Sequence, residues 1–348
     1  MTRRRWLVAL LAAVLGAVAA GSIAVHRVRA ELDRPLPIAV PIVYRIAPGS
    51  SLARIAAGLH RRGVLPAPRL WALYARWRGE AGAVRAGEYE LRPGLSARGL
   101  LEKLVKGEIL LRSFTIVDGW RVADLLAAMR ASPYLTTTLP RDPQHLMARF
   151  GERGRSPEGE FLPETYEFPR GTSDVALLAI AHRALVKTLA AAWRSRAPGL
   201  PLADPQQLLV LASIVEKESA RPDERALIAG VYLHRLEIGM RLQADPTVIF
   251  GLGDRYRGRL HEVDLRADGP YNTYTRAGLP PTPIALPGAA VIDACAHPAK
   301  TDALYFVASG KGDGRHVFSA TLAEQNAAVK RYLRRLKRRE AATPKERR

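Results

Sequence analysis

Cysteine is nearly absent from this chain of 348 residues, which has a single one, Cys295. One cysteine excludes an intramolecular disulfide and any zinc site built from several cysteines. The sequence also lacks the glycine-rich loops that bind nucleotide phosphates and the Gly-x-Ser-x-Gly turn of serine hydrolases. Its eight histidines are scattered, and none forms the His-x-x-x-His pair of a zinc-binding helix. These absences exclude several common enzyme classes.

Positive charge is concentrated at the two ends of the chain. The formal net charge is +20 at pH 7, from 53 Lys and Arg against 33 Asp and Glu. Lys330 to Arg348 holds ten basic and two acidic residues, and five arginines flank the first apolar run (Arg3–Arg5, Arg27 and Arg29). A basic protein can bind nucleic acid, but a basic tail beside an anionic surface explains this placement at least as well. DNA binding would also require the folded part of the chain to lie in the cytoplasm, and the N-terminal segment does not favour that location.

One long apolar run lies near the N-terminus. Trp6 to Val25 is a run of 20 residues without a charge. At about 1.5 Å per residue it spans roughly 30 Å, the thickness of a bilayer core. Arg3–Arg5 precede it and favour a cytoplasmic N-terminus, although Arg27 and Arg29 weaken that asymmetry. A cleaved signal peptide is the alternative, because Ala17–Ala19 resembles a cleavage site, but signal runs are usually only about 7–15 residues long. Under either interpretation, the rest of the chain is exported across the membrane.

Two similar segments follow. Val43–Ile46 predicts a strand, followed by a Pro-Gly turn and a helix capped by Ser51. Tyr89–Leu91 predicts a second strand, followed by another Pro-Gly turn and a helix capped by Ser96. The Pro-Gly-x-Ser motif recurs after 45 residues, which indicates an internal repeat. Small strand–helix units of this kind occur in modules that bind cell-wall glycans, but they can also serve only for packing and spacing.

The remaining chain predicts one larger α+β domain. The apolar spacing predicts a strand at Phe114–Val117 and helices at about 122–129, Ala176–Ala192, Pro205–Glu218 and Glu224–Ile238. Near the C-terminus we expect a buried strand at Leu304–Val307, a hairpin partner at His316–Phe318 and a short, very basic helix end at Tyr332–Arg339.

One carboxylate stands out in the helix expected at Pro205–Glu218. With about 100° of rotation per residue, Glu218 falls inside the apolar stripe that Leu211 and Val215 help to form, whereas Glu216 falls on its far edge. Burial raises the pKa of a carboxyl group, as a general acid near neutral pH requires.

The two glutamates of this helix point in different directions, about 200° apart. Glu216 and Glu218 therefore cannot easily flank one glycosidic bond as the paired carboxylates of an ordinary glycosidase do. Glycan chemistry at this site would use a single carboxylate. The alternative is that Glu218 is a helix-end residue that bends into solvent or pairs with Arg221 or Arg225.

Polar loops fixed by prolines follow this helix. They are Arg241–Thr247, Tyr271–Thr275 and Gly278–Ile284, and they are rich in Asn, Gln, Thr and Tyr. Such loops can offer hydrogen bonds and aromatic faces to sugars while losing little entropy on binding. The alternative is that the prolines only stiffen a crossing loop.

At these residues the sequence closely resembles the endolytic murein transglycosylase family, the MltG or YceG-like proteins. The matching stretches are Glu158–Tyr166, Leu211–Glu218, Arg241–Gly251, Tyr271–Thr275, Gly278–Pro281 and Ala296–Lys300. Their order and spacing match from Ile46 to about Tyr332, and the N-terminal anchor fits as well.

The resemblance implies a single-pass protein of the inner membrane, with a LysM-like module and a catalytic domain in the periplasm. It implies cleavage of nascent peptidoglycan strands between N-acetylmuramic acid and N-acetylglucosamine, and it assigns the catalytic glutamate to Glu218. In the implied mechanism Glu218 acts first as acid and then as base, and it leaves a 1,6-anhydro end. No water, metal or cofactor is consumed. The implied partners are peptidoglycan strands, the inner membrane and peptidoglycan synthases, and no nucleic acid.

Four further residues are our candidates for holding the glycan: Gln243, Asp245, Asn272 and Tyr274. Asp245 can instead cap a helix.

We therefore expect a cytoplasmic tail (1–5), a transmembrane helix (6–25), a linker (26–41), a LysM-like βα module (42–112), a larger α+β catalytic domain (113–330) and a basic tail (331–348). The alternative function is a membrane-tethered peptidoglycan-binding or scaffolding protein without turnover.

Overall fold

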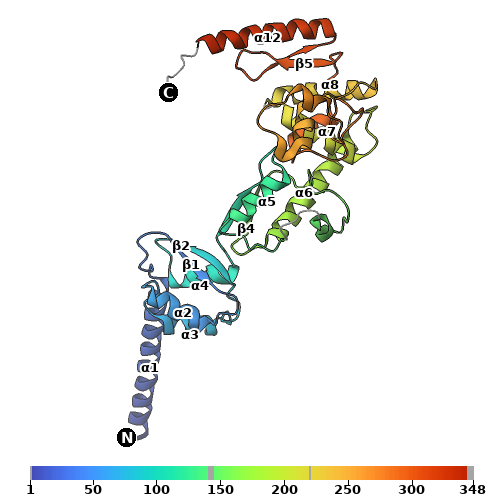
Figure 1. Cartoon of the computed structure of the whole chain (residues 1–348). Helices are drawn as coiled ribbons and strands as arrows, with labels where there is room; N and C mark the ends of the chain where they lie inside the picture. Colours follow the sequence, from blue (N-terminus) through green and yellow to red (C-terminus); the bar gives the residue numbers. More distant parts are fainter. Residues whose placement is uncertain (1, 140–144, 219–220, 343–348) are drawn as a thin grey trace. The chain divides into compact units, whose positions relative to one another are not determined.

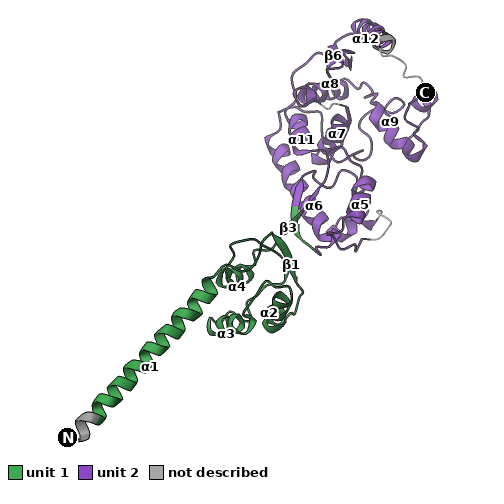
Figure 2. Ribbon diagram, turned by 90° about the vertical axis from the view of Figure 1, so that its left-hand side faces the viewer, with its two compact units in different colours: residues 1–112, 167–170 green, residues 113–166, 171–348 purple. Residues whose placement is uncertain are grey.

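The computed structural model describes residues 2–139, 145–218 and 221–342. The fold is a mixture of α-helices and short two-stranded sheets (Figure 1). The chain divides into two compact units, coloured separately in Figure 2. Unit 1 comprises residues 1–112 and 167–170, and unit 2 comprises residues 113–166 and 171–348. Each unit is described by itself below.

Helix α1 (Thr2–Asp33) carries the apolar run and is longer than the predicted span. The side chains of its apolar part are exposed, and the helix is long and apolar enough to cross a membrane. It continues through the first part of the segment expected to be a linker and ends just before Pro35, where a proline disfavours helix in the preceding residue. Leu32, Leu36 and Ile38 are buried in the core of unit 1, so this end of α1 is packed against the unit.

Unit 1 contains α1, β1 (Ile42–Ile46), α2 (Leu52–Arg61), α3 (Pro68–Trp77), β2 (Gly87–Leu91) and α4 (Ala97–Lys106). Strands β1 and β2 pair antiparallel, with Ile42 opposite Leu91. Ser51 and Ser96 cap α2 and α4 as predicted, because their hydroxyls accept hydrogen bonds from the backbone N–H groups three residues later.

The helix α3 was not predicted, and it supplies a central part of the core of unit 1. Trp71 is fully buried, and its indole N–H donates a 2.8 Å hydrogen bond to the carbonyl of Ala97. Tyr74 and Ala75 lie buried on the same side of the helix. This packing leaves the opposite side of α3 at the surface.

A second two-stranded sheet consists of β3 (Leu111–Thr115) and β4 (Thr165–Pro169). The strand predicted at Phe114–Val117 therefore begins and ends earlier than expected. The helix predicted after it is present as α5 (Val122–Ala131), with Val122, Leu125, Leu126 and Met129 buried.

Unit 2 has its core around α7. Besides α5 and the C-terminal α12 (Leu322–Ala342), the helices of this unit are α6 (Asp174–Ser195), α7 (Pro205–Glu218), α8 (Arg225–Glu237), α9 (Asp245–Leu252), α10 (Glu262–Arg266) and α11 (Ala289–Ala296). Short 3₁₀ turns lie at Met147–Phe150, Pro222–Glu224 and Gly253–Arg255. Every residue of α7 from Leu208 to Val215 is buried. A helix that is buried on all sides is a central helix, and Figure 1 shows α7 inside this group of helices.

Helix α6 is also long and apolar enough to cross a membrane by composition. Its residues Leu177, Leu178, Ala181, Leu185 and Leu189 are buried in the unit, however, so it is a core helix of unit 2. Burial of an apolar side accounts for its hydropathy without a lipid environment.

The C-terminal part differs from two expectations. Strands β5 (Tyr305–Ala308) and β6 (His316–Ser319) form the predicted hairpin, but Tyr305–Val307 are half-buried, so the prediction of a buried strand is wrong. The basic helix end predicted at Tyr332–Arg339 is part of the 21-residue helix α12 (Leu322–Ala342). Arg335 on α12 donates a 2.6 Å hydrogen bond to the carbonyl of Ser309, which ties this helix to the hairpin. Residues 343–348 of the predicted basic tail lie outside the described residues.

Candidate active site

Glu218 lies in the last turn of α7 and is bonded to a tyrosine on the next helix. The Tyr232 hydroxyl donates a 2.5 Å hydrogen bond to Glu218 Oε1. Tyr232 is 2% exposed and lies edge-on to Phe306 of β5, with ring centroids 5.8 Å apart. Burial, together with the adjacent Glu218 carboxyl, raises the pKa of Tyr232 well above its ordinary value, so its hydroxyl stays protonated and acts as the donor.

The pKa of Glu218 is raised to about 7. Burial of the carboxyl group is the main cause, and the negative charge of Asp245 adds to it. The hydrogen bond from Tyr232 and the positive charge of Arg235 act in the opposite direction and lower this pKa, but burial dominates. Glu218 is thus a carboxyl group that exchanges a proton near neutral pH.

Two of the predicted glycan-holding residues lie near Glu218. Tyr274 donates a 2.6 Å hydrogen bond from its hydroxyl to Asp245 Oδ1. Both residues interact electrostatically with Glu218. Asp245 raises the pKa of Glu218, and Glu218 contributes to the raised pKa of Tyr274. Asp245 is the first residue of α9 and follows the N-cap residue Ala244, so it lies in the first helical turn without occupying the cap.

Gln243 lies in the loop before α9 and has an unusual backbone. Its φ of 49° is left-handed, the one such value among non-glycine residues in the described part of the chain. The backbone N–H of Gln243 donates a 3.1 Å hydrogen bond to the carbonyl of Thr273, while its side chain is exposed. Left-handed backbone at residues other than glycine costs energy and is concentrated at functional sites. The backbone of Gln243 is thus bonded to the neighbouring Tyr271–Thr275 segment, and its side chain points into solvent.

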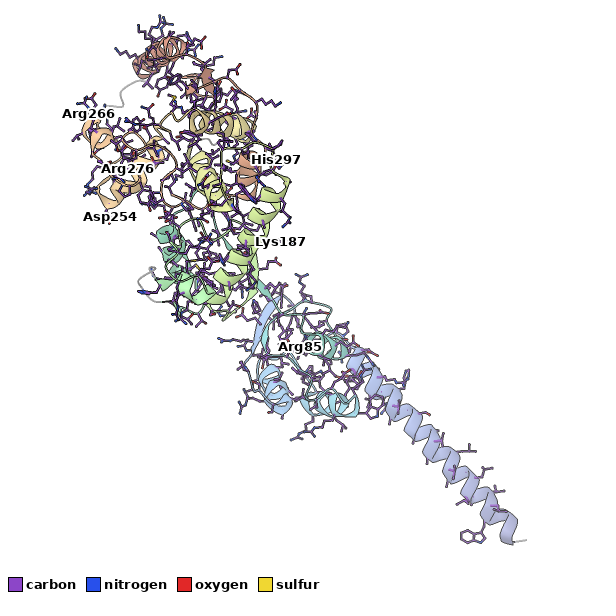
Figure 3. All side chains as sticks on the ribbon, turned by 90° about the vertical axis from the view of Figure 1, so that its right-hand side faces the viewer. Arg85, Lys187, Asp254, Arg266, Arg276 and His297 are labelled. Carbon is purple, nitrogen blue, oxygen red and sulfur yellow. The ribbon has the colours of Figure 1, made fainter. Side chains whose placement is uncertain are left out.

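Asn272 is 5% exposed, and its amide group is engaged by the protein itself. Its Nδ2 donates to the carbonyls of Asp264, Leu265 and Ala267, and its Oδ1 accepts from the backbone N–H of Tyr274. These bonds fix Tyr274 to the segment around α10. Figure 3 labels Asp254, Arg266 and Arg276, which lie close together at one edge of unit 2. Asn272 positions Tyr274 and does not itself project from the surface.

Tyr232 and Arg235, one helical turn apart on α8, were not identified from the sequence. Arg235 is 6% exposed and donates 2.6 Å hydrogen bonds to the carbonyls of Leu304 and Leu242. It connects α8 to the start of the hairpin and to the loop that contains Gln243. Neither residue belongs to a motif with a chemical signature, so only their three-dimensional contacts identify them.

The position of Glu216 differs from the prediction. Its side chain is 5% exposed, its Oε2 accepts a 3.0 Å hydrogen bond from the N–H of Gly288, and its Oε1 lies 3.5 Å from Arg225. The sequence placed Glu216 only at the far edge of the apolar stripe, but its side chain is buried because Gly288, at the start of α11, covers that side of the helix as well. Among the described residues, Arg225 pairs with Glu216 and Arg221 with Asp223, and neither forms an ion pair with Glu218, as one form of the alternative would require.

Glu158 is a second carboxyl group with a pKa raised to about 7 by burial. Its Oε1 accepts a 3.0 Å hydrogen bond from the N–H of Val122, the first residue of α5. It is therefore tied to the start of that helix.

In the described part of the chain, no three His, Cys, Asp or Glu side chains gather in a way that could hold a metal ion.

Comparison with known proteins identifies relatives across most of the chain. The model of the YceG-like family matches residues 44–331. The endolytic murein transglycosylase of Bacillus subtilis is 30% identical over 309 residues, which cover 83% of this chain and 84% of that protein. The endolytic murein transglycosylase of Streptococcus pneumoniae is 28% identical over 316 residues, which cover 80% of this chain and 56% of that protein.

A solved structure is also similar. The crystal structure of a yceG-like protein from Listeria monocytogenes has 28% sequence identity and a TM-score of 0.51, and the match covers 82% of this chain and 98% of that one. Because the family model spans both units and a relative at 30% identity covers most of both proteins, the chain belongs to the YceG-like family.

Proposed function

We propose that this protein is a membrane-anchored endolytic lytic transglycosylase that cleaves peptidoglycan strands between N-acetylmuramic acid and N-acetylglucosamine. Membership of the YceG-like family and the endolytic murein transglycosylases among its relatives support the activity and the substrate. The observation that carries the mechanism is Glu218, whose carboxyl group has a pKa of about 7 and is held by Tyr232.

The mechanism needs one carboxyl group. Protonated Glu218 donates its proton to the glycosidic oxygen, the bond from C1 of N-acetylmuramic acid to that oxygen breaks, and the leaving sugar departs with a hydroxyl group. The resulting carboxylate takes the proton of the C6 hydroxyl, and O6 bonds to the oxocarbenium-like C1. The product is a 1,6-anhydro end, and Glu218 regains its proton. Because Tyr232 occupies Oε1, we assign both proton transfers to Oε2.

The described geometry supports different roles in glycan binding for the residues near Glu218. Gln243 is exposed on a strained loop, and the Asp245–Tyr274 pair lies within electrostatic reach of Glu218. We propose that these three residues contact the sugars, and that Asn272 positions Tyr274 for that contact.

The proposed function also includes a location for the protein, at the inner membrane with its catalytic domain in the periplasm. The exposed apolar length of α1 supports a single-pass anchor in the inner membrane, with the N-terminus in the cytoplasm and the catalytic domain in the periplasm. The antiparallel β1–β2 pair with its capped helices supports a LysM-like module in unit 1. Peptidoglycan synthases are the partners that we propose for an enzyme acting on nascent strands.

A non-catalytic, membrane-tethered scaffold is the competing function. It gives no reason for a carboxyl group with a raised pKa at the end of a central helix, since burying such a group costs folding free energy. Mass spectrometry of glycan strands incubated with the purified protein decides between the two. The proposal expects internal cleavage products with 1,6-anhydro ends. Unchanged strands would support the scaffold, and reducing ends would mean hydrolysis by water.

A further inference from the structure

Unit 1 contains a long stretch of sequence with charge of only one sign. Between Asp33 and Glu80 there are eight arginines and no acidic residue. Some of these arginines have partners, because Arg78 pairs with Glu80 and Arg62 lies over the ring of Tyr44. Others remain at the surface as unbalanced positive charge.

Helix α3 presents a mixed basic and apolar side to solvent. Arg69, Leu73, Arg76 and Trp77 lie within about 100° of one another around this helix, opposite the buried Trp71. Trp77 is 80% exposed and Leu73 is 63% exposed. A nearly fully exposed tryptophan beside a leucine is rarely left in water without a function.

A groove of about 450 Å³ lies between α2 and the adjoining side of α3, and it shares Arg69 and Arg76 with the exposed side. Small side chains (Ala53, Ala57 and Ala72) and the arginines Arg61, Arg69 and Arg76 line it. In the described residues, no acidic side chain forms an ion pair with these three arginines. The groove and the exposed side of α3 together form one surface, the α2–α3 face, defined by Arg61, Arg69, Leu73, Arg76 and Trp77.

The end of α1 fixes the position of this face relative to the apolar run. A cavity of about 210 Å³ is lined by Glu31 and Leu32 of α1 and by Leu70 and Trp71 of α3, so the two helices are neighbours there. Asp33 of α1 is also held by Arg98, with Nε and Oδ1 2.5 Å apart. The last turn of α1 is therefore part of unit 1 and not a hinge.

The distance along α1 is short. From Val25, the last residue of the apolar run, to Leu32 the helix rises only about 10 Å at 1.5 Å per residue. The polar headgroup layer of one leaflet occupies about 5–8 Å outside the hydrocarbon core. Figures 1 and 2 both show α3 on the side of unit 1 from which α1 extends. If α1 crosses a bilayer, Leu32 thus lies only a few ångströms beyond the headgroup layer, and α3 is on the side of unit 1 that faces this layer.

We propose that the α2–α3 face docks on the anionic headgroups of the same bilayer that α1 crosses. Trp77 and Leu73 enter the boundary between headgroups and acyl chains, where tryptophan is favoured, and Arg61, Arg69 and Arg76 bind headgroup phosphates. This contact holds unit 1 down on the membrane surface, so that α1 and α3 attach it at two points. The inference rests on the anchoring part of the proposed function.

The test uses the full chain in lipid vesicles and a fluorescent label at Leu73→Cys. Selective labelling is possible because Cys295 is fully buried. The matched control is Val43→Cys, an exposed position on β1. Vesicles contain either phosphatidylcholine alone or phosphatidylcholine with phosphatidylglycerol, and a spin label on the lipid headgroup quenches any fluorophore that reaches it.

We expect the label at position 73, but not the label at position 43, to be quenched and shifted to shorter wavelength in the anionic vesicles. The double change Arg69→Gln/Arg76→Gln should weaken docking by about fivefold for each arginine. Arg45→Gln/Arg92→Gln, which removes equal charge from β1 and from the residue that follows β2, should leave it unchanged.

Each other outcome has a distinct meaning. Protein that floats with phosphatidylcholine vesicles but shows no quenching at position 73 in anionic ones overturns the docking and leaves the anchor intact. Protein that does not float refutes the anchor itself. A shift at position 73 caused by soluble peptidoglycan fragments, and not by anionic lipid, overturns the proposal and assigns the face to wall binding. None of these results depends on turnover at Glu218.

Discussion

Tyr232 donates a 2.5 Å hydrogen bond to Glu218 Oε1, joining α8 to the last turn of α7. This bond stabilises the carboxylate, whereas burial of the group favours its neutral form. The balance sets the pKa of Glu218 at about 7. A group that must first give and then accept a proton works best when its pKa lies near the working pH.

The Tyr232→Phe change removes the donor and retains the buried ring. Because the hydrogen bond lowers the pKa of Glu218, that pKa should rise, by about one to two units for a bond to a charged group. The protonated acid then persists to higher pH, and the falling limb of kcat/KM against pH should move upward. Tyr271→Phe is the matched control, since its hydroxyl bonds Thr282. An unmoved limb would show that Tyr232 does not tune the acid.

The stability of a Glu218→Gln variant should depend on pH. The folded-state pKa of about 7 lies above the ordinary value of 4.5, so the folded chain holds an extra proton between these values. As the pH rises through this window, the glutamate ionises in the unfolded chain but stays protonated in the fold, so the free energy of unfolding falls until the pH passes about 7. Glutamine cannot ionise, so the variant should match the wild type near pH 4.5 and exceed it by up to about 3 kcal/mol at pH 8. Denaturant unfolding at the two pH values measures this, with Glu237→Gln at the exposed end of α8 as control. Equal curves at pH 8 would contradict the raised pKa.

Glu216→Gln should harm stability more than chemistry. The change leaves the half-buried Arg225 without its charged partner, which should cost about 1–3 kcal/mol of unfolding free energy. Turnover by the folded fraction should stay within about tenfold of the wild type, because Glu216 binds the N–H of Gly288 and Arg225 and not Glu218. Unfolding curves and steady-state kinetics on the same samples separate the two effects. A loss of activity as large as that of Glu218→Gln in a stable protein would assign Glu216 to the reaction.

Removal of residues 334–348 should leave turnover within a few fold. These residues lie beyond the last family motif, but the deletion also breaks the bond between Arg335 and Ser309. We therefore expect a melting temperature lower by about 2–4 °C, as for a loss of about 1 kcal/mol in a domain of this size. Deleting only residues 343–348 preserves Arg335 and serves as control. Complete loss of turnover in a folded protein would show that this end belongs to the active domain.

Local sequence patterns were sufficient to predict those elements whose ends are set by one or a few neighbouring residues. The Ser51 and Ser96 caps, the bounds of α7 and the turn between β5 and β6 follow from short motifs and periodicity. The extension of α1 to Asp33 was missed because Leu32 and Leu36 are held by the core of unit 1, a contact distant in sequence.

The candidate site was predictable only in part. The resemblance assigned the catalytic role to Glu218, and this stays a prediction. The environment of its carboxyl group depends on Tyr232, 14 residues further along the chain. A helical projection assumes one buried side, and α7 is covered on several, so the burial of Glu216 was missed. Contacts between helices decide these features, and no single-helix pattern contains them.

Glu218 is the centre of the account, and one comparison tests it most directly. The products and rates of the wild type and Glu218→Gln should be measured on the same peptidoglycan strands by mass spectrometry, with circular dichroism to confirm folding. We predict 1,6-anhydro ends from the wild type and a rate lower by at least about 10²–10⁴-fold in the variant, the range for loss of a general acid–base group. A folded Glu218→Gln protein that still forms anhydro ends at the wild-type rate would contradict the account.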